Sequence, residues 1–350
     1  MCSSDLDVSL SSTVLSLLVA RRGELVVEEY FNGAEAAHAH NIFSTTKLLT
    51  DLAIGAAVDD GIVPGLDTTL GEWVDETTGH PAGRITLEQL LSMRSGLATE
   101  ATEPFSAQLV ADAPLSSEPG STYAYATDNS ELLALGLDRR ALDGFCRYLH
   151  ERVFDPMGVT VDHWHETPYG NVTGGSYAFL TPRELARLGQ LLLDRGRWED
   201  EQLVSSAWIE SMAEVRTDFG CHGVNAATAT SLVKQGRGMG ITTSEVVGFD
   251  VWSAGGFGGQ AILVVPFLDL VVVITQEVAP VFERRLPTLD VLDAILRTVT
   301  GATESTESPC GSRSLSVRDA SGAESELPVP SAGLFTDWSP DGSQVAIVSV

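Results

Sequence analysis

The chain has 350 residues, of which 43% are hydrophobic and 20% charged, and this composition is ordinary for a globular protein. A chain of this length forms one large domain or two of medium size. Its formal net charge of -27 argues against a nucleic acid or an anionic membrane surface as partner, because like charges repel.

The cysteines and the N-terminus say little about the compartment. Cys2, Cys146, Cys221 and Cys310 are far apart, and their spacing matches neither a metal site nor a redox pair. No run of about 18 apolar residues predicts a membrane span. Residues 1–6 lack the basic and apolar regions of a signal peptide, so the sequence as given predicts a cytoplasmic protein. If the N-terminus is truncated, as its unrelated-looking first residues suggest, we expect a periplasmic or secreted protein.

Both ends of the chain carry strand patterns. Residues 14–31 predict two strands around a tight turn. Residues 260–265 and 270–275 predict a second hairpin, and an amphipathic helix is expected over residues 287–299. We therefore expect one antiparallel sheet built from both termini.

Helical patterns fill the middle of the chain. A helix with a broad apolar face begins at Ser44 and ends near Gly61. Capping boxes at residues 86–89 and 181–184 open two further helices. We expect a mostly helical insertion over about residues 62–215. The predicted fold class is α/β, of the α+β type, with an antiparallel sheet flanked by helices.

The amino-acid composition changes after Gly301. Residues 302–332 are rich in Ser, Glu, Pro and Ala and predict a linker. Residues 333–350 contain a turn followed by a strand and resemble the start of one blade of a propeller-type repeat. One blade cannot bury its own apolar face, so we expect a truncated second domain or an unfolded tail there. The first domain is expected to span residues 7–301.

The first candidate for chemistry is Ser44-Thr45-Thr46-Lys47. A serine in the first helical turn points toward the positive end of the helix dipole, which favours a developing alkoxide. Lys47 lies one turn further on the same face. In an apolar setting its neutral amine could take the serine proton. The alternative is a helix cap beside a solvated lysine.

The same spacing recurs at Ser231 and Lys234. This second copy runs into Gly236 and Gly238, which a helix does not tolerate, so its two side chains need not share a face. We interpret it as a chance match.

Two further candidates follow along the chain. Residues 119–129 hold Tyr123 and Tyr125, and a tyrosine on this predicted loop could relay protons to a leaving group, or it is a packing aromatic. Paired glycines in residues 253–260 precede the late hairpin. They could let a substrate approach the backbone and leave an N–H free for an oxyanion, or they mark a bulged strand.

In this order the three motifs resemble the serine β-lactamase and penicillin-binding-protein superfamily, in its esterase and 6-aminohexanoate-oligomer hydrolase branch. The resemblance covers about residues 14–300 and includes supporting stretches at residues 85–97, 180–189 and 258–266. It implies a β-lactamase/transpeptidase-like fold, and an acyl-enzyme mechanism that needs neither a cofactor nor a metal.

Carried over to this chain, the resemblance makes Ser44 the nucleophile, Lys47 its base and Tyr125 the proton-transfer residue. It implies an oxyanion hole formed by the backbone N–H groups of Ser44 and Phe257. The implied substrate-binding residues are Thr127, Ala254, Gly255 and Gly256.

Two departures from the family pattern affect the substrate. Thr127 stands where asparagine is frequent, and Ala254 stands where lysine or histidine is usual. Without that polar group the site loses a contact to the carboxylate of a β-lactam, so we expect small neutral esters, amides or peptide-like substrates. The alternatives are a β-lactamase or D-alanyl-D-alanine peptidase, and a non-catalytic ligand-binding or sensor domain. The histidines His163 and His165 are expected on a surface loop rather than on a metal.

Overall fold

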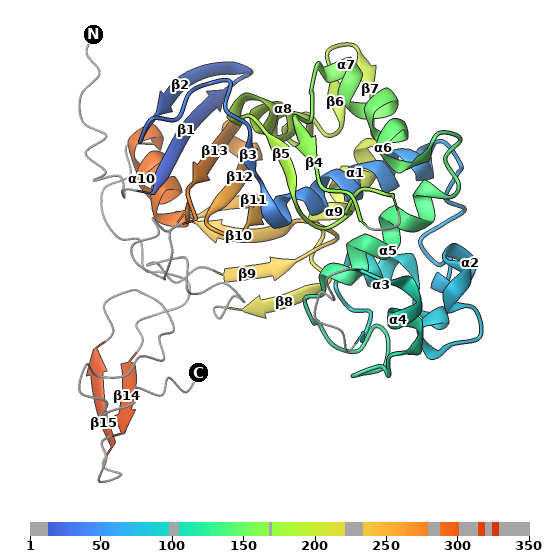
Figure 1. Ribbon diagram of the computed structural model, residues 1–350. Coiled ribbons are helices and arrows are strands. Elements are labelled where there is room, and N and C mark those ends of the chain that lie inside the picture. Colours follow the sequence, from blue (N-terminus) through green and yellow to red (C-terminus); the bar gives the residue numbers. More distant parts are fainter. Residues whose placement is uncertain are drawn as a thin grey trace.

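A computed structural model of the chain describes residues 13–97, 105–167, 170–220, 234–278, 288–300, 314–318 and 324–328. Its centre is an antiparallel eight-stranded sheet in the order β2-β1-β13-β12-β11-β10-β9-β8 (Figure 1). The strands are β1 (Val14–Arg21), β2 (Glu24–Tyr30), β8 (Thr217–Gly220), β9 (Lys234–Arg237), β10 (Thr242–Val246), β11 (Phe249–Gly256), β12 (Gln260–Val265) and β13 (Leu270–Gln276). The predicted sheet from both termini is confirmed, because β1 pairs with β13.

Both predicted hairpins form, since their sequences favour strands on each side of a tight turn. β1 and β2 flank Arg22 and Gly23, which both have positive φ. β12 and β13 consist mainly of Val, Ile and Leu, and every residue in them is buried. Such continuous apolar runs are typical of strands covered on both faces.

Helices cover both faces of the sheet and form a separate layer beyond it. α10 (Thr288–Thr300) packs on one face through an apolar cluster that includes Leu263 and Val272. α8 (Pro182–Leu193) contacts β1, β12 and β13. Its predicted capping box is present in full, with Thr181 and Glu184 exchanging hydrogen bonds.

Of the predicted helical insertion, the helices between residues 70 and 149 lie to one side of the sheet, with α1 (Thr46–Asp59) between the two regions (Figure 1), whereas α8 packs on the sheet itself. The remaining helices are α2 (Leu70–Trp73), α3 (Leu87–Leu91), α4 (Ala107–Asp112), α5 (Thr127–Asp138), α6 (Gly144–Leu149), α7 (Asp155–Met157) and α9 (Ser206–Ala213). The capping box that opens α3 also forms, between Thr86 and Gln89. The fold class predicted from the sequence is confirmed.

Short strands complete the description. β3 (His40–Asn41), β5 (Ala178–Leu180) and β4 (His163–Trp164) form a three-stranded sheet, and β6 (Arg197–Trp198) pairs with β7 (Glu201–Gln202). Inside the predicted linker the structure describes a hairpin of β14 (Ser314–Arg318) and β15 (Glu324–Pro328), which the sequence analysis did not anticipate. Residues 333–350 lie outside the described part, so the domain boundary near Gly301 stays a prediction.

Candidate active site

Ser44 stands where a short strand turns into α1. The chain leaves β3 and is held to β5 by a hydrogen bond from the Ile42 N–H to the Ala178 carbonyl, at 3.0 Å. Phe43 then takes a positive φ of 46°, a conformation that is costly for a bulky side chain, and its N–H donates to Oδ1 of Asn41. Strained backbone of this kind is frequent at functional sites. Ser44 follows within a single 3-10 turn, directly before the N-terminus of α1.

Lys47 lies at the centre of the candidate site with only 3% of its surface exposed. Its Nζ lies 2.7 Å from the carbonyl oxygen of Gly175, 3.3 Å from Oγ1 of Thr127 and 3.4 Å from Oγ of Ser44. It also lies over the Tyr125 ring, 5.0 Å from the ring centre. The sequence alternative of a solvated lysine is therefore wrong.

Tyr125 lies in the loop before α5, with 48% of its surface exposed. Burial of its hydroxyl raises the pKa, but the charge of Lys47 and hydrogen bonding to Lys47 and Ser44 lower it by more. The pKa of Tyr125 thus lies below its ordinary value. A phenol in this state exchanges a proton more readily at neutral pH.

The late glycine motif forms the end of β11. Strand β10 pairs with β11 only as far as Ser253, whereas β12 pairs with it through Gly256, so residues 254–256 have a strand partner on one side alone among the described strands. Gly256 packs against the turn that carries Ser44, where a Cβ would lie 2.2 Å from the Ile42 carbonyl oxygen. Phe257 follows Gly256, and its ring packs edge-on against that of Phe43, with the ring centroids 5.7 Å apart.

The structure thus brings Ser44, Tyr125 and Thr127 around Lys47, and it sets Gly256 and Phe257 against the turn that carries Ser44. Thr127, at the start of α5, accepts a hydrogen bond from Lys47. Ala254 is buried on β11 and offers no polar group, and Gly255 is exposed beside it. Of the second serine–lysine pair, Ser231 lies outside the described residues, and Lys234 begins strand β9.

The sequence analysis missed two buried acids that interact with Lys47, Asp51 and Glu131, and a buried arginine, Arg237, that interacts with Asp51. Burial raises the pKa of both Asp51 and Glu131 to about 7, although the charge of Lys47 lowers each of them. Arg237, at the end of β9, also lowers the pKa of Asp51. A signal for Asp51 was present, because it interrupts an apolar helical run, whereas Glu131 follows the polar residues 127–130 and does not stand out. Groups with strongly shifted pKa values cluster at functional sites.

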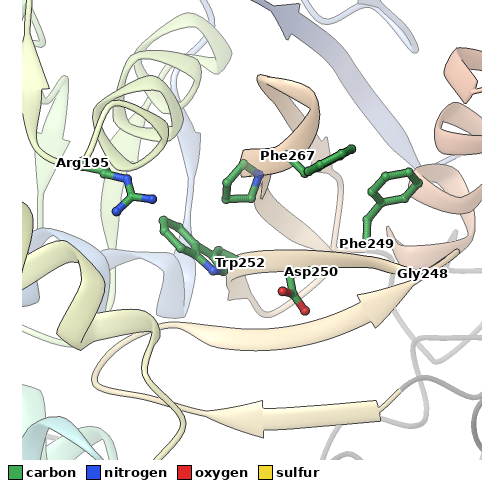
Figure 2. Close-up of a pocket in the computed structure, with 7 residues that line it drawn as sticks. Arg195, Gly248, Phe249, Asp250, Trp252 and Phe267 are labelled. Atoms are coloured by element: carbon green, nitrogen blue, oxygen red, sulfur yellow. The ribbon is translucent and has the colours of Figure 1, made fainter.

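A separate cavity of about 560 Å³ lies at the turns that join β10 to β11 and β12 to β13 (Figure 2). Its aromatic side chains are Phe249, Trp252 and Phe267, with Arg195 at one side. None of the residues implied by the family resemblance lines it. Within the described ranges no three His, Cys, Asp or Glu side chains gather as metal ligands would. No described helix is long and apolar enough to cross a membrane.

Comparison with known proteins agrees with this geometry. The Beta-lactamase family model matches residues 11–295, well over half of the sequence. The chain belongs to the β-lactamase family. The 6-aminohexanoate-dimer hydrolase of Paenarthrobacter ureafaciens is 27% identical over 252 residues. That alignment covers 62% of this chain and 62% of the relative, so the chain spans less than two thirds of the relative's length.

Solved structures of this family share the fold. The octameric penicillin-binding protein homologue from Pyrococcus abyssi superposes with a TM-score of 0.68 at 16% identity, covering 85% of this chain and 76% of that one. The D-amino acid amidase from Ochrobactrum anthropi gives a TM-score of 0.63 at 16% identity, with 82% and 94% covered. The family expected from the sequence is confirmed by the match to the family model, and the solved structures agree with the expected fold.

Proposed function

We propose that the chain is a serine hydrolase that cleaves a carboxylic ester or amide through an acyl-enzyme on Ser44. One observation carries the proposal. Lys47 is almost fully buried, and its Nζ lies 3.4 Å from Oγ of Ser44 and over the ring of Tyr125. A nucleophile within reach of a base that a third group orients is the arrangement that covalent catalysis needs.

In the first step, Oγ of Ser44 forms a bond to the substrate carbonyl carbon and gives its proton to Nζ of Lys47, the general base. Tyr125 then passes a proton from Lys47 to the leaving oxygen or nitrogen as its bond to the acyl carbon breaks. The backbone N–H groups of Ser44 and Phe257 stabilise the negative oxygen of the tetrahedral intermediate. Water attacks the acyl-enzyme by the reverse proton path and restores Ser44.

The surroundings of the glycine motif at residues 253–260 favour a small substrate that is neutral or peptide-like. Ala254 offers only a methyl group where a cationic residue would hold a carboxylate. The free side of residues 254–256 on β11 can pair with the backbone of an extended substrate. The names of the relatives, a 6-aminohexanoate-dimer hydrolase and a D-amino acid amidase, support amides beside esters.

The test is hydrolysis of p-nitrophenyl butyrate by the wild type, by Ser44→Ala and by the matched control Ser231→Ala, on equal amounts of folded protein. We expect Ser44→Ala to lose activity by a factor of at least about 10³ and Ser231→Ala to keep it. Equal activity in Ser44→Ala and the wild type would overturn the assignment of the nucleophile.

Two further measurements separate the alternatives. Turnover of a chromogenic cephalosporin at a rate above that of the ester would favour a β-lactamase or D-alanyl-D-alanine peptidase. Covalent labelling of Ser44 without release of product would favour a non-catalytic binding domain.

A further inference from the structure

Two consecutive glycines lie between α1 and α5, and α1 binds both of their carbonyl groups. Oγ1 of Thr50 donates to the Gly174 carbonyl oxygen at 2.6 Å, and Nζ of Lys47 donates to that of Gly175 at 2.7 Å. The second contact is the shortest that Lys47 makes, so the position of this peptide fixes the position of the amine.

The N–H groups of the same two glycines are bound from the other side by one carboxylate. The Gly174 N–H donates to Oε2 of Glu131 at 2.8 Å, and the Gly175 N–H donates to Oε1 at 3.0 Å. Glu131 projects from α5 and is only 4% exposed. Every backbone donor and acceptor of the pair thus has a side-chain partner on α1 or α5.

Gly174 and Gly175 pack so closely against α5 that neither position has room for a side chain. A Cβ at Gly174 would lie 2.3 Å from the Ser130 carbonyl oxygen, and one at Gly175 would lie 2.6 Å from Cγ2 of Thr127. Contacts under about 3 Å do not occur between such atoms, so the glycines let the chain pass against α5.

We propose that Glu131 is a positioning residue, which holds the Lys47 amine beside Ser44 through the two N–H groups of Gly174 and Gly175. The inference rests on the proposed serine hydrolase function and deepens it. Glu131 does not touch the substrate; it acts through the diglycine segment. An ionised carboxylate accepts strongly through both oxygens at once, whereas protonation turns one of them into a hydroxyl donor that is a weaker acceptor.

The charge state of Glu131 therefore links the position of Lys47 to pH. Burial raises the pKa of Glu131 to about 7, and the charge of Asp128 on the same helix also raises it. The hydrogen bonds from the two glycine N–H groups and the charge of Lys47 lower the pKa by less. Residues 173–176 carry no titratable side chain. As the pH falls through about 7, the carboxylate gains a proton and one of its oxygens becomes a weaker acceptor. We expect the reaction at Ser44 to slow over the same range.

The experiment compares the wild type with Glu131→Gln and with Glu184→Gln as matched control. Glu184 is also a buried glutamate that accepts two backbone N–H groups, those of Thr160 and Thr181, but it caps α8 and does not contact Lys47. Two readouts are taken from pH 5.5 to 9. They are the rate at which a fluorophosphonate probe labels Ser44, and kcat and KM for p-nitrophenyl butyrate.

A glutamine at position 131 keeps one acceptor but turns an NH₂ group toward a glycine N–H, which displaces the segment. At pH 8 we expect Glu131→Gln to label Ser44 and turn over ester about 10- to 100-fold more slowly, with KM little changed. We also expect its rate to vary less between pH 6 and 8 than that of the wild type. Asp51 titrates in the same range, so the difference between the two pH profiles is the quantity to compare.

The outcomes distinguish this inference from the proposed function. If Glu131→Gln matches Glu184→Gln in both rate and pH profile, the carboxylate is only structural and the inference is wrong. If the wild type neither labels at Ser44 nor hydrolyses ester, the proposed function fails and the inference falls with it. A loss confined to Glu131→Gln, with the pH profile altered, supports both.

Discussion

Two buried regions of the molecule are built from opposite chemistry. Between the sheet and α10 lies a cluster whose members are all apolar, among them Leu263, Val272 and Leu292. Between α1 and α5, by contrast, Lys47 and Glu131 are equally buried although they carry ionisable groups. Apolar burial stabilises the fold, whereas burying a charge costs free energy unless partners compensate it. The difference fits the proposal that the first region stabilises the fold and the second serves the reaction at Ser44.

The largest effect expected from this comparison is on activity, at Lys47. Lys47→Met fills a similar volume but removes the only amine that contacts both Ser44 and Gly175 in the described structure. We expect ester hydrolysis to fall by about 10²- to 10⁴-fold, the usual worth of a positioned acid–base group. The measurement is kcat/KM for p-nitrophenyl butyrate on protein shown to be folded by circular dichroism.

Leu48→Met is the matched control for that variant. Leu48 is the next residue on α1 and is buried in the apolar core, where a swap of similar volume is well tolerated. A loss of activity in Leu48→Met as large as that in Lys47→Met would mean that α1 is merely sensitive to change.

The next effect is on stability, in the apolar region. Leu292 on α10 is fully buried, so Leu292→Ala removes apolar contacts and leaves a cavity. We expect the free energy of unfolding to fall by about 2–5 kcal/mol, measured by urea denaturation. The kcat of the protein that remains folded should match the wild type. A lower kcat in folded Leu292→Ala would break the division between the two regions.

Most of the fold could be predicted because its signals are local. The hairpin of β12 and β13 follows from a continuous apolar run broken by Pro266 and Asp269, and α8 follows from the capping box at Thr181 and Glu184. Strands β8, β9 and β10 were not predicted. Their sequences are short and mostly polar, so pairing determines them rather than local pattern: β10 pairs with β11, β9 with β10 and β8 with β9.

The residues of the candidate site also differ in how far local sequence predicts them. Ser44 and Lys47 could be paired from their spacing on one helix, whereas Tyr125 was identified only through the family resemblance. Glu131 and the Gly175 carbonyl could not be found, since the hydrogen bond from Lys47 to Gly175 joins residues 128 positions apart. Only tertiary packing brings such groups together, and no short pattern encodes it.

The smallest effect expected is a gain in stability from Asp51→Asn. Burial raises the pKa of Asp51 from its ordinary value of 3.8 to about 7, although the charges of Arg237 and Lys47 lower it. Between these two values the folded protein holds a proton that the unfolded chain has released, so wild-type stability falls as the pH rises from about 4 to about 7. Asparagine mimics the protonated form and removes this loss.

At pH 8 we therefore expect Asp51→Asn to be more stable than the wild type by roughly 1–3 kcal/mol in urea unfolding, and the two to converge toward pH 4. Asp250→Asn, on an exposed part of β11, controls for the loss of one negative charge. An Asp51→Asn protein that keeps the wild-type pH dependence would contradict the raised pKa. The two substitutions thus change the free energy of unfolding in opposite directions. Leu292→Ala lowers it because truncation of an apolar side chain removes favourable burial. Asp51→Asn raises it because neutralising Asp51 removes the cost of a buried charge.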